Sequence, residues 1–317
     1  MDIRKLLSST SAFKILKADK QNNTLSHAIL VTCDDILMLE TYLTYFAKLL
    51  ACKSDEPCLT CRTCSLIDKR SFVDATFYPI GKKILVQDID DLIEKSYFKP
   101  LESENKLFVL LNAHEMNAQA QNKLLKTLEN PPANTIILLG ATTTNTLLST
   151  VLSRVKKLEI GKFSDGEIIN VLSSECSDLN RLQSAVKLSF GKVGEALNKY
   201  NLNDGNKAYD ASVKVLLELL TSKQVASFSA EIDGEILNDF ISITSRLVEE
   251  AMLEKSGIAS RDKNVNLIAS KYTYGALIYV QDKLREAEKS LHFNGNATAI
   301  KDALLFGVLE GKYKWSK

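Results

Sequence analysis

The chain has 317 residues, 45% of them hydrophobic and 25% charged, as is typical of a soluble globular protein of two or three domains. Lys and Arg total 40 against 39 for Asp and Glu, a net charge of +1, so the composition indicates no broad basic surface for nucleic acid. The first residues lack the apolar core of a signal peptide, and no apolar run reaches membrane-spanning length. We therefore expect a cytoplasmic protein without membrane contact, whose six cysteines are thiols or metal ligands and not disulfides.

The first half of the chain alternates between strand and helix patterns. Four short apolar runs have the composition of buried parallel strands: 27–31, 105–113, 134–142 and 155–160. Three stretches between them are typical of helices, and a double proline ends the last: 39–52, 86–99 and 118–132. This alternation predicts an α/β fold with a doubly wound parallel sheet and right-handed crossovers.

The second half is predicted to be all-α. All five prolines lie at or before Pro132, and the strand signals stop after about Phe163. A small helical unit follows, with Ser164 or Asp165 capping its first helix. Long amphipathic patterns from Lys207 onward predict a helical bundle: 211–223, 236–253, 272–291 and 293–315. The predicted domains are 1–163, 164–206 and 207–317.

Four cysteines lie within the stretch "ACKSDEPCLTCRTCSL": Cys52, Cys58, Cys61 and Cys64. Thiolates spaced this closely can converge on one tetrahedral zinc ion, and four protein ligands leave no open position, so such a zinc is structural and not catalytic. An iron–sulfur cluster is the competing interpretation, because "CLTCRTC" matches three ligands of a bacterial ferredoxin run. Here the fourth cysteine lies upstream and no Cys-Pro follows, so zinc is favoured.

The segment "CDDILMLE" connects the first predicted strand to the first long helix, where nucleotide-binding proteins carry a phosphate loop. Such a loop needs glycines, a lysine for the phosphates and a Ser or Thr for magnesium. This chain has Leu39 and Glu40 in place of Lys-Thr, and Asp34 and Asp35 add negative charge. The helix dipole favours a phosphate by only ~0.3–1 kcal/mol, so we expect the carboxylates to outweigh it.

The other half of an ATP site is an acidic pair at a strand end, which positions magnesium and the attacking water. The predicted strand at 105–113 carries Leu111-Asn112 there, and Glu115 would lie in the following turn. Both halves of the site thus lack their chemistry, and we predict that the chain binds no ATP. Spacing alone leaves open a doubly wound sheet that never held a nucleotide.

Four motifs, in this order, resemble those of the bacterial DNA polymerase III clamp-loader family of AAA+ proteins: "SHAILV", "ACKSDEPCLTCRTC", "NKLLKTLENPP" and "LLSTVLSRV". Within the family, the missing loop and acidic pair are similar to delta-prime subunits and not to the ATP-hydrolysing tau/gamma subunits. Gly194 also favours a delta-prime subunit, because it stands in the segment where motor subunits carry a phosphate-sensing arginine. The resemblance covers roughly residues 10–200 and implies an AAA+ module with a zinc-binding insertion, a small helical lid and a C-terminal collar that assembles a five-subunit ring.

The resemblance also implies partners and an acting residue. The partners would be tau/gamma and delta subunits, the sliding clamp and, through the complex, primer–template DNA, with this chain a non-ATPase subunit in clamp loading. A Ser-Arg-Cys motif in the family presents an arginine finger to a neighbour's ATP, and Arg154 in "LSRV" matches it. Val155 replaces the Cys, which affects packing but not the guanidinium. Without the family, Ser153-Arg154 would be interpreted as a surface helix end.

Two alternative functions stay open at this stage. The first is an ATP-hydrolysing subunit of the tau/gamma type that uses unconventional residues, against which residues 33–40 argue. The second is a zinc-ribbon nucleic-acid-binding protein, which needs a basic surface with exposed aromatic side chains beside the cysteines. The nearby basic residues alternate with acidic ones, and no aromatic residue precedes Phe72 in this segment.

Overall fold

The computed structural model describes residues 2–78, 83–202, 205–234, 236–258, 260, 262–293 and 295–314. The chain divides into two compact units, residues 1–197 and 198–317. The predicted division into 1–163, 164–206 and 207–317 is finer, and its boundaries stay predictions. None of the helices within the described ranges is long and apolar enough to cross a membrane.

The first unit is built on a five-stranded parallel sheet. Its strands are β1 (Ala28–Thr32), β2 (Ala75–Tyr78), β3 (Lys106–Leu110), β4 (Thr135–Ala141) and β5 (Lys156–Glu159). They are arranged in the order β2-β3-β4-β1-β5, which confirms the predicted doubly wound sheet. Four strands match the predicted apolar runs. Strand β2 was missed because its sequence, "ATFY", is only four residues long and has no continuous apolar run.

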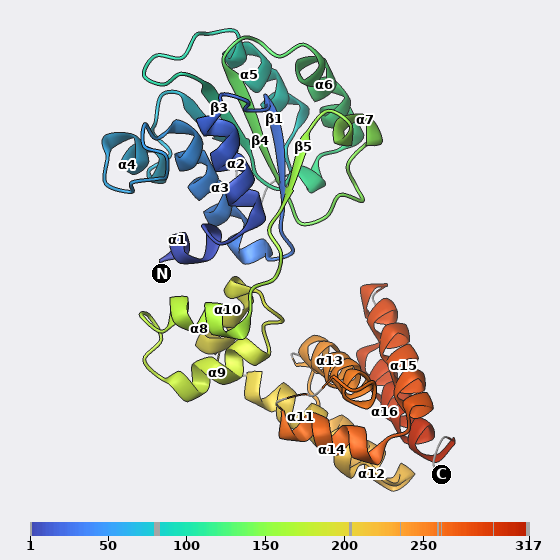
Figure 1. Ribbon diagram of the computed structural model, residues 1–317. Helices are drawn as coiled ribbons and strands as arrows, with labels where there is room; N and C mark the ends of the chain where they lie inside the picture. Colours follow the sequence, from blue (N-terminus) through green and yellow to red (C-terminus); the bar gives the residue numbers. More distant parts are fainter. Residues whose placement is uncertain are drawn as a thin grey trace. The chain divides into compact units, whose positions relative to one another are not determined.

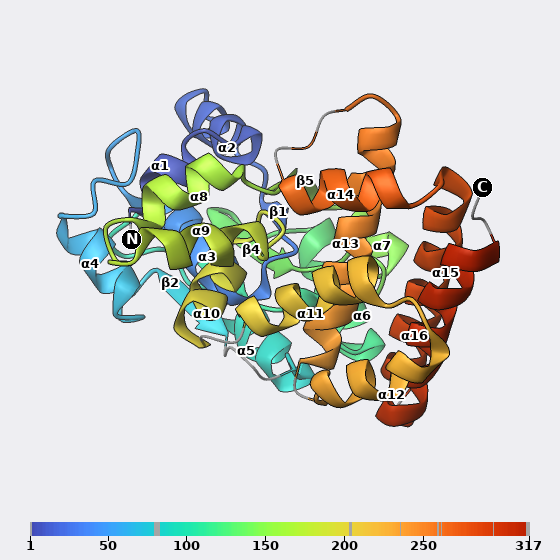
Figure 2. The ribbon, with the colours of Figure 1, turned by 90° about the horizontal axis from the view of Figure 1, so that it is seen from below.

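Helices cover both faces of this sheet. Those of the first unit are α1 (Ile3–Leu7), α2 (Ser11–Gln21), α3 (Ile36–Ala51), α4 (Arg62–Asp68), α5 (Val86–Ser96), α6 (Ala118–Glu129), α7 (Ser149–Leu152), α8 (Asp165–Leu172) and α9 (Leu179–Lys187), with a 3-10 turn η1 (Ala113–Glu115). Helix α10 (Val193–Leu202) crosses the division between the units. Helices α2 and α3 lie on one face of the sheet and α5 and α6 on the other, while α1 lies beside α8 (Figures 1 and 2).

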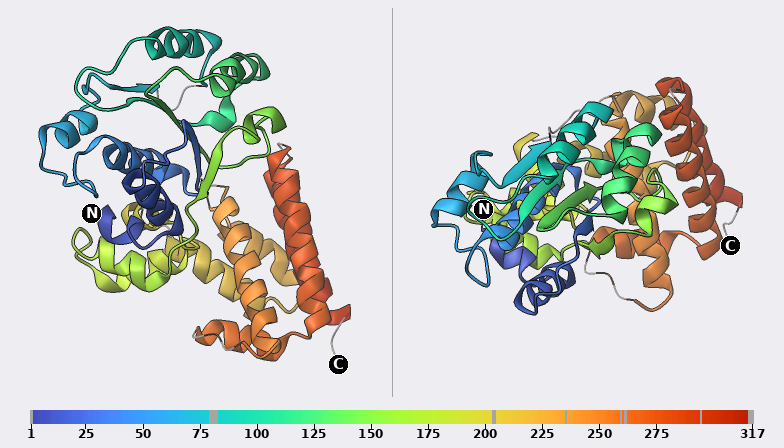
Figure 3. Two further views of the ribbon diagram at one scale, coloured as in Figure 1. Left: turned by 45° about the horizontal axis from the view of Figure 1, so that its top comes forward. Right: turned by 90° about the horizontal axis from the view of Figure 1, so that it is seen from above.

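Apolar packing fixes these helices against the strands. Helices α5 and α6 cover one face of the sheet (Figure 3). Beneath them, Leu92 and Leu124 pack with Phe108 of β3, and all three are fully buried. On the other face, a Cβ atom at Gly140 of β4 would lie 2.1 Å from Leu43 Cδ1, so only glycine lets α3 approach the strand this closely. Burial on both faces explains why the strands are nearly continuous apolar runs.

Helix ends agree with the sequence. Helix α6 ends at Glu129, before the double proline that cannot continue it. Ser164 caps α8, with its Oγ accepting the N–H of Glu167 while the Glu167 carboxylate accepts the N–H of Ser164. The sequence left Ser164 and Asp165 as alternatives, and the structure selects Ser164.

The second unit is the predicted helical bundle. Its helices are α11 (Gly205–Glu218), α12 (Ser222–Glu231), α13 (Leu237–Lys255), α14 (Lys263–Lys271), α15 (Tyr274–His292) and α16 (Ala297–Lys314). The predicted helix at 211–223 is wrong at its end, because the chain leaves the helix after Glu218 and a new helix starts at Ser222. Lysines of α16 satisfy carbonyls at two helix ends: Lys301 donates to Ile232 and Lys312 to Leu219.

Asp74, directly before β2, is a buried carboxylate that organises the loop leading to β3. It is 1% exposed and accepts the N–H groups of Leu101, Glu102 and Ser103 at 2.7–2.8 Å. Burial by itself would raise the pKa of Asp74, but these donors outweigh it, and the pKa lies below its usual value.

Asp74→Asn should lower the free energy of unfolding by about 1–3 kcal/mol at pH 7, because an amide cannot accept all three N–H groups. The folded-state pKa lies below the unfolded value of about 3.9, so the carboxylate's contribution is present above that pH and is lost on acidification. In urea unfolding, the difference in the free energy of unfolding between wild type and Asp74→Asn should therefore be smaller at about pH 3 than at pH 7. The control is Asp282→Asn, at an exposed position. An equal loss in both variants would contradict the role of Asp74.

Candidate functional site

The four cysteines come together between the end of α3 and α4. The Sγ atoms of Cys52, Cys58, Cys61 and Cys64 all lie within 4.8 Å of one another. Cys52 Sγ is 3.7 Å from Cys58 Sγ and 3.9 Å from Cys61 Sγ. Four sulfurs bonded to one zinc at about 2.3 Å stand about 3.8 Å apart, whereas disulfide sulfurs lie about 2.05 Å apart. The spacing fits a four-thiolate metal site and not a disulfide.

Backbone N–H groups donate to two of the cysteine sulfurs, and the pKa values of Cys58 and Cys64 are shifted in opposite directions. The N–H of Cys61 donates to Cys58 Sγ at 3.3 Å, and the N–H of Cys64 donates to Cys61 Sγ at 3.4 Å. Backbone donors from Thr60 and Cys61 lower the pKa of Cys58 to about 6. Burial raises the pKa of Cys64, so a metal ion bound there would have to displace its proton.

Charged side chains anchor this cysteine module, residues 52–64, to α2 and α3. Lys20 Nζ, on α2, donates to the carbonyls of Leu49 and Ser54 at 2.8 Å and also to that of Cys52. Lys48 of α3 is largely buried and pairs with Asp68 at the end of α4 at 2.5 Å. The module is therefore held as part of the first unit's core and not as a free loop.

Several backbone donors of the segment between β1 and α3 are used within the chain. The N–H of Cys33 donates to the carbonyl of Ala141 at 3.0 Å, and that of Asp35 donates to Cys33 Sγ at 3.4 Å. Leu39, where a phosphate loop has its lysine, is 1% exposed and belongs to the core. Part of the backbone donors of this segment are thus used within the chain, and a core leucine fills the position of the loop lysine.

Asp35 closes this segment against α10. Its carboxylate is 3% exposed, and Oδ2 accepts the N–H of Gly194 at 2.8 Å. A Cβ atom at position 194 would lie 2.7 Å from Asp35 Oδ1 and 2.5 Å from Leu37 Cβ, so the contact requires glycine. Burial raises the pKa of Asp35, although the Gly194 N–H partly offsets this effect. Oδ1 has no hydrogen-bond partner within the described parts of the chain.

The other two carboxylates near the loop also have partners. Asp34 Oδ2 lies 3.7 Å from Lys192 Nζ and 3.9 Å from Lys162 Nζ. Glu40, in the place of the magnesium-binding Ser or Thr, pairs with Arg70 at 2.6 Å. The Arg70 guanidinium also stacks 3.7 Å from the Phe77 ring and borders a cavity of about 400 Å³. Each charge is thus balanced by a lysine or arginine of the same chain.

At the end of β3, the positions of the missing acidic pair are apolar or constrained. Leu111 is buried, and Asn112 adopts a left-handed backbone with φ 55°, which Asn tolerates better than most residues. Glu115 lies in η1, in the turn after the strand, as the sequence predicted. Its carboxylate is 4.0 Å from His114 Nε2, and burial lowers the pKa of His114.

Arg154 lies just after the short helix α7, near the end of α6. Its Nη1 donates to the Thr150 carbonyl at 2.8 Å and to Ser153 Oγ at 3.1 Å, and its Nη2 is 2.8 Å from Glu129 Oε1. About a third of the side chain is exposed. Val155 is partly buried against the core under α5 and α6, so a valine fits where the family motif has cysteine.

Gln121 of α6 is a positioning residue that the sequence analysis missed. It is 2% exposed and holds the segment before α7 on both sides: Nε2 donates to the Thr146 carbonyl at 3.0 Å, and Oε1 accepts the Leu148 N–H at 2.8 Å. The available signal was a glutamine on the apolar face of an amphipathic helix, three and seven residues before Leu124 and Leu128. Such a polar residue in the core needs partners.

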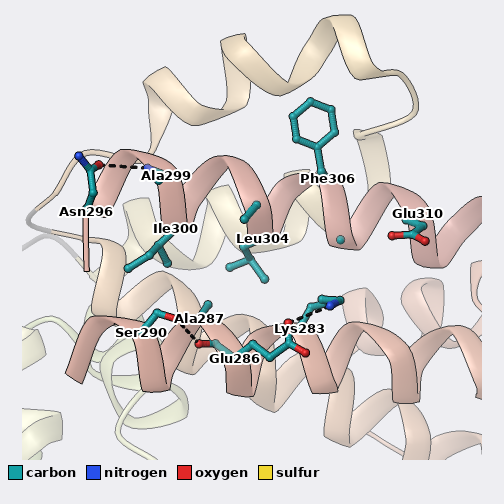
Figure 4. A pocket seen from close by; sticks show the side chains of 12 residues that line it. Lys283, Glu286, Ala287, Ser290, Asn296, Ala299, Ile300, Leu304, Phe306 and Glu310 are labelled. Atoms are coloured by element: carbon teal, nitrogen blue, oxygen red, sulfur yellow. Dashed lines mark hydrogen bonds and ion pairs between the residues drawn. The ribbon is translucent and has the colours of Figure 1, made fainter. Parts of the chain in front are cut away.

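The second unit has a groove between α15 and α16 with a volume of about 390 Å³ (Figure 4). Ile300 and Leu304 of α16 point toward α15, and Lys283 pairs with Glu286 at 2.8 Å on the groove wall. Phe306 points away from α15 and is 49% exposed. The groove thus combines apolar side chains with this ion pair.

Comparisons with known proteins identify the family of this chain. Residues 8–164 match a family model described as DNA polymerase III, delta subunit. The delta' subunit of Haemophilus influenzae is 35% identical over 132 residues, 40% of either chain, and the tau subunit of Bacillus subtilis is 28% identical over 226 residues, 70% of this chain and 36% of tau. The chain belongs to the DNA polymerase III clamp-loader family. Its α/β sheet followed by helices is accordingly of AAA+ type.

This chain spans well under two thirds of those relatives' own lengths. A solved gamma subunit-related protein of DNA polymerase III from Thermotoga maritima aligns with 94% of this chain and 99% of its own, with a TM-score of 0.45 and 17% identity. RuvB of the same organism aligns with 96% of this chain and 87% of its own, with a TM-score of 0.42 and 15% identity.

Proposed function

We propose that this chain is a delta-prime-type subunit of the DNA polymerase III clamp loader, without ATPase activity of its own. It would help load the sliding clamp onto primed DNA and present Arg154 to the ATP of a neighbouring tau/gamma-type subunit. The observation that carries the proposal is the closure of the β1–α3 segment by Asp35, which takes the N–H of Gly194. A subunit closed in this way can still offer a surface arginine in trans.

The charges around this segment support the absence of nucleotide. A phosphate entering there would meet the carboxylates of Asp34 and Asp35 and no loop lysine, and the nearby Lys162 and Lys192 already face Asp34. It would also have to break the Asp35–Gly194 hydrogen bond, leaving a buried carboxylate without its donor, which costs about 1–3 kcal/mol or more for a charged group. Magnesium lacks its usual ligands, because Glu40 is paired with Arg70 and no acidic residue directly follows β3.

The isolated chain should therefore show no saturable, magnesium-dependent ATP binding by isothermal titration calorimetry and no ATP hydrolysis above background. Leu39→Lys should not restore binding, because the loop glycines and the acidic pair would still be missing. A tau/gamma-type subunit in the same buffer is the positive control. Micromolar affinity for ATP in this chain would favour the tau/gamma-type alternative instead.

We also propose a structural zinc ion bound by Cys52, Cys58, Cys61 and Cys64. The sulfur spacing, the N–H groups directed at two of the sulfurs and the anchoring of the module by Lys20 and Lys48 support it. Four thiolates complete a tetrahedral shell, so the ion would stabilise the module and carry out no chemistry. An iron–sulfur cluster is the competing outcome of the test.

Elemental analysis should give one zinc per chain in wild type and none in Cys61→Ser, with the apparent Tm lowered by roughly 4–8 °C, or about 2 kcal/mol. Because all four thiols must lose their protons to bind the ion, zinc should be released on acidification. Cys176→Ser, at a buried cysteine outside the cluster, should keep its zinc. If the analysis finds iron and the protein absorbs visible light, the site holds an iron–sulfur cluster and not zinc.

Arg154 is suited to act on a neighbour's nucleotide. A guanidinium is permanently charged and can bind phosphate oxygens at two points, and here it lies partly exposed on the surface of the first unit. Gln121 and the Thr150 carbonyl fix the segment and the side chain, which limits the entropy lost on engagement. The nucleotide segment of this chain is closed by its own residues, so the arginine's target would belong to another subunit.

In a reconstituted complex, Arg154→Ala should assemble normally but lower clamp- and DNA-stimulated ATPase and clamp loading. Arginine fingers contribute on the order of 10³–10⁵ in well-studied GTPases, and a ring in which only one site depends on this residue should lose much less. Arg154→Lys should rescue poorly, because it keeps the charge and loses the fork. Arg4→Ala, at an exposed arginine of α1, is the control. Undiminished loading by Arg154→Ala would leave the chain a passive scaffold.

We propose that residues 164–206 form the lid and that the bundle, 207–317, is the collar that assembles with tau/gamma and delta subunits. Large apolar side chains exposed on α15 and α16 support an assembly surface: Tyr274, Ile278, Phe306 and Tyr313. Through the assembled ring, the chain would act on the sliding clamp and primer–template DNA.

A further inference from the structure

Glu129, the last residue of α6, is the acidic partner of Arg154. Its Oε1 lies 2.8 Å from Arg154 Nη2, and the two side chains are 46% and 35% exposed. The contact joins two separate elements, because Arg154 follows α7. The guanidinium is therefore already bound to an anion when the chain is alone.

Helix α6 by itself does not favour a carboxylate at this position. The carbonyl end of a helix carries partial negative charge, and an acidic residue in the last turn is repelled by it. Arg154 supplies the compensating positive charge within hydrogen-bond distance. Arg154 thus balances the unfavourable charge that the Glu129 carboxylate meets at the end of the helix.

Arg154 is held by two kinds of contact. On one side, Nη1 donates to the Thr150 carbonyl and to Ser153 Oγ, both from its own segment. On the other side, Nη2 faces the carboxylate of Glu129. Loss of Glu129 would leave the contacts of Nη1 intact, so the arginine would keep its position and lose only its counter-charge.

We propose that Glu129 is the resting counter-ion of Arg154, which the phosphate of a neighbouring subunit's nucleotide displaces when the arginine engages. This inference rests on the proposed function of Arg154. A phosphate carries more negative charge than a carboxylate and repels it, so the two anions would compete for the same guanidinium. Exchange is feasible because both side chains reach solvent, and an ion pair of this exposure shifts an equilibrium by at most about five-fold.

The consequence is a threshold for engagement. While Glu129 neutralises Arg154, a distant or poorly placed phosphate is only weakly attracted by the arginine. Only a phosphate close to the guanidinium replaces the carboxylate. Glu129 is therefore a positioning residue for Arg154 and not a catalytic residue.

The test is Glu129→Gln in the reconstituted complex, because glutamine keeps the length and an oxygen acceptor but removes the charge. Without clamp and DNA, the apparent KM for ATP hydrolysis should fall by roughly two- to five-fold, whereas kcat at saturating ATP with clamp and primed DNA should stay unchanged. Asp90→Asn is the matched control. Asp90 of α5 makes a similarly exposed ion pair with Lys123, which lies in α6 as Glu129 does. The Tm of the isolated Glu129→Gln chain should stay within about 3 °C of wild type.

The double variant Glu129→Gln, Arg154→Ala separates this inference from the proposed function. It should show the KM of Arg154→Ala alone, because Glu129 acts through the arginine. If Arg154→Ala itself has no effect on ATPase or loading, the proposed function fails and the inference fails with it. If Arg154→Ala lowers the rate but Glu129→Gln leaves KM unchanged or raises it, the counter-ion role alone is overturned. A KM decrease that persists in the double variant would also overturn it.

Discussion

The hydrogen bond from the Gly194 N–H to the carboxylate of Asp35 joins the segment after β1 to the start of α10. Asp35 is almost fully buried, and burial of a charge is unfavourable, which is why its pKa is raised. The contact is possible only because residue 194 has no side chain, since any Cβ there would collide with Asp35 and Leu37. One acidic residue in the loop and one glycine more than 150 residues later therefore define a single closed joint.

The surrounding charges follow the same pattern of internal pairing. Asp34 faces Lys162 and Lys192, and Glu40 is bound to Arg70, which itself stacks on Phe77. Arg70 lies two residues after the end of α4, and α3 and the edge strand β2 meet at its guanidinium. Charged side chains of the chain itself thus line the carboxyl edge of the sheet, next to the cavity that Arg70 borders.

Arg154 differs from these charges in its exposure. The Asp35 contact is buried and constrained by sterics, whereas Arg154 and Glu129 reach solvent and can change partners. Gln121 is buried in the core, and the partly buried Val155 packs against it. A rigid support that carries an exchangeable surface ion pair is a suitable arrangement for a residue that acts on another subunit.

The sequence by itself determined the doubly wound sheet, the helical bundle and the clustering of four cysteines, because apolar periodicity and short ligand spacing are local patterns. It missed β2, whose four residues at a sheet edge carry no apolar run, and it extended the helix at 211–223 beyond Glu218. It identified Arg154 only through the family resemblance. Tertiary structure alone decided that Asp35 meets Gly194, that Gln121 holds the segment before Arg154 and that Glu129 pairs with Arg154. Each of these contacts joins residues that are far apart in the chain, and their proximity follows from strand order and helix packing, which no local pattern encodes.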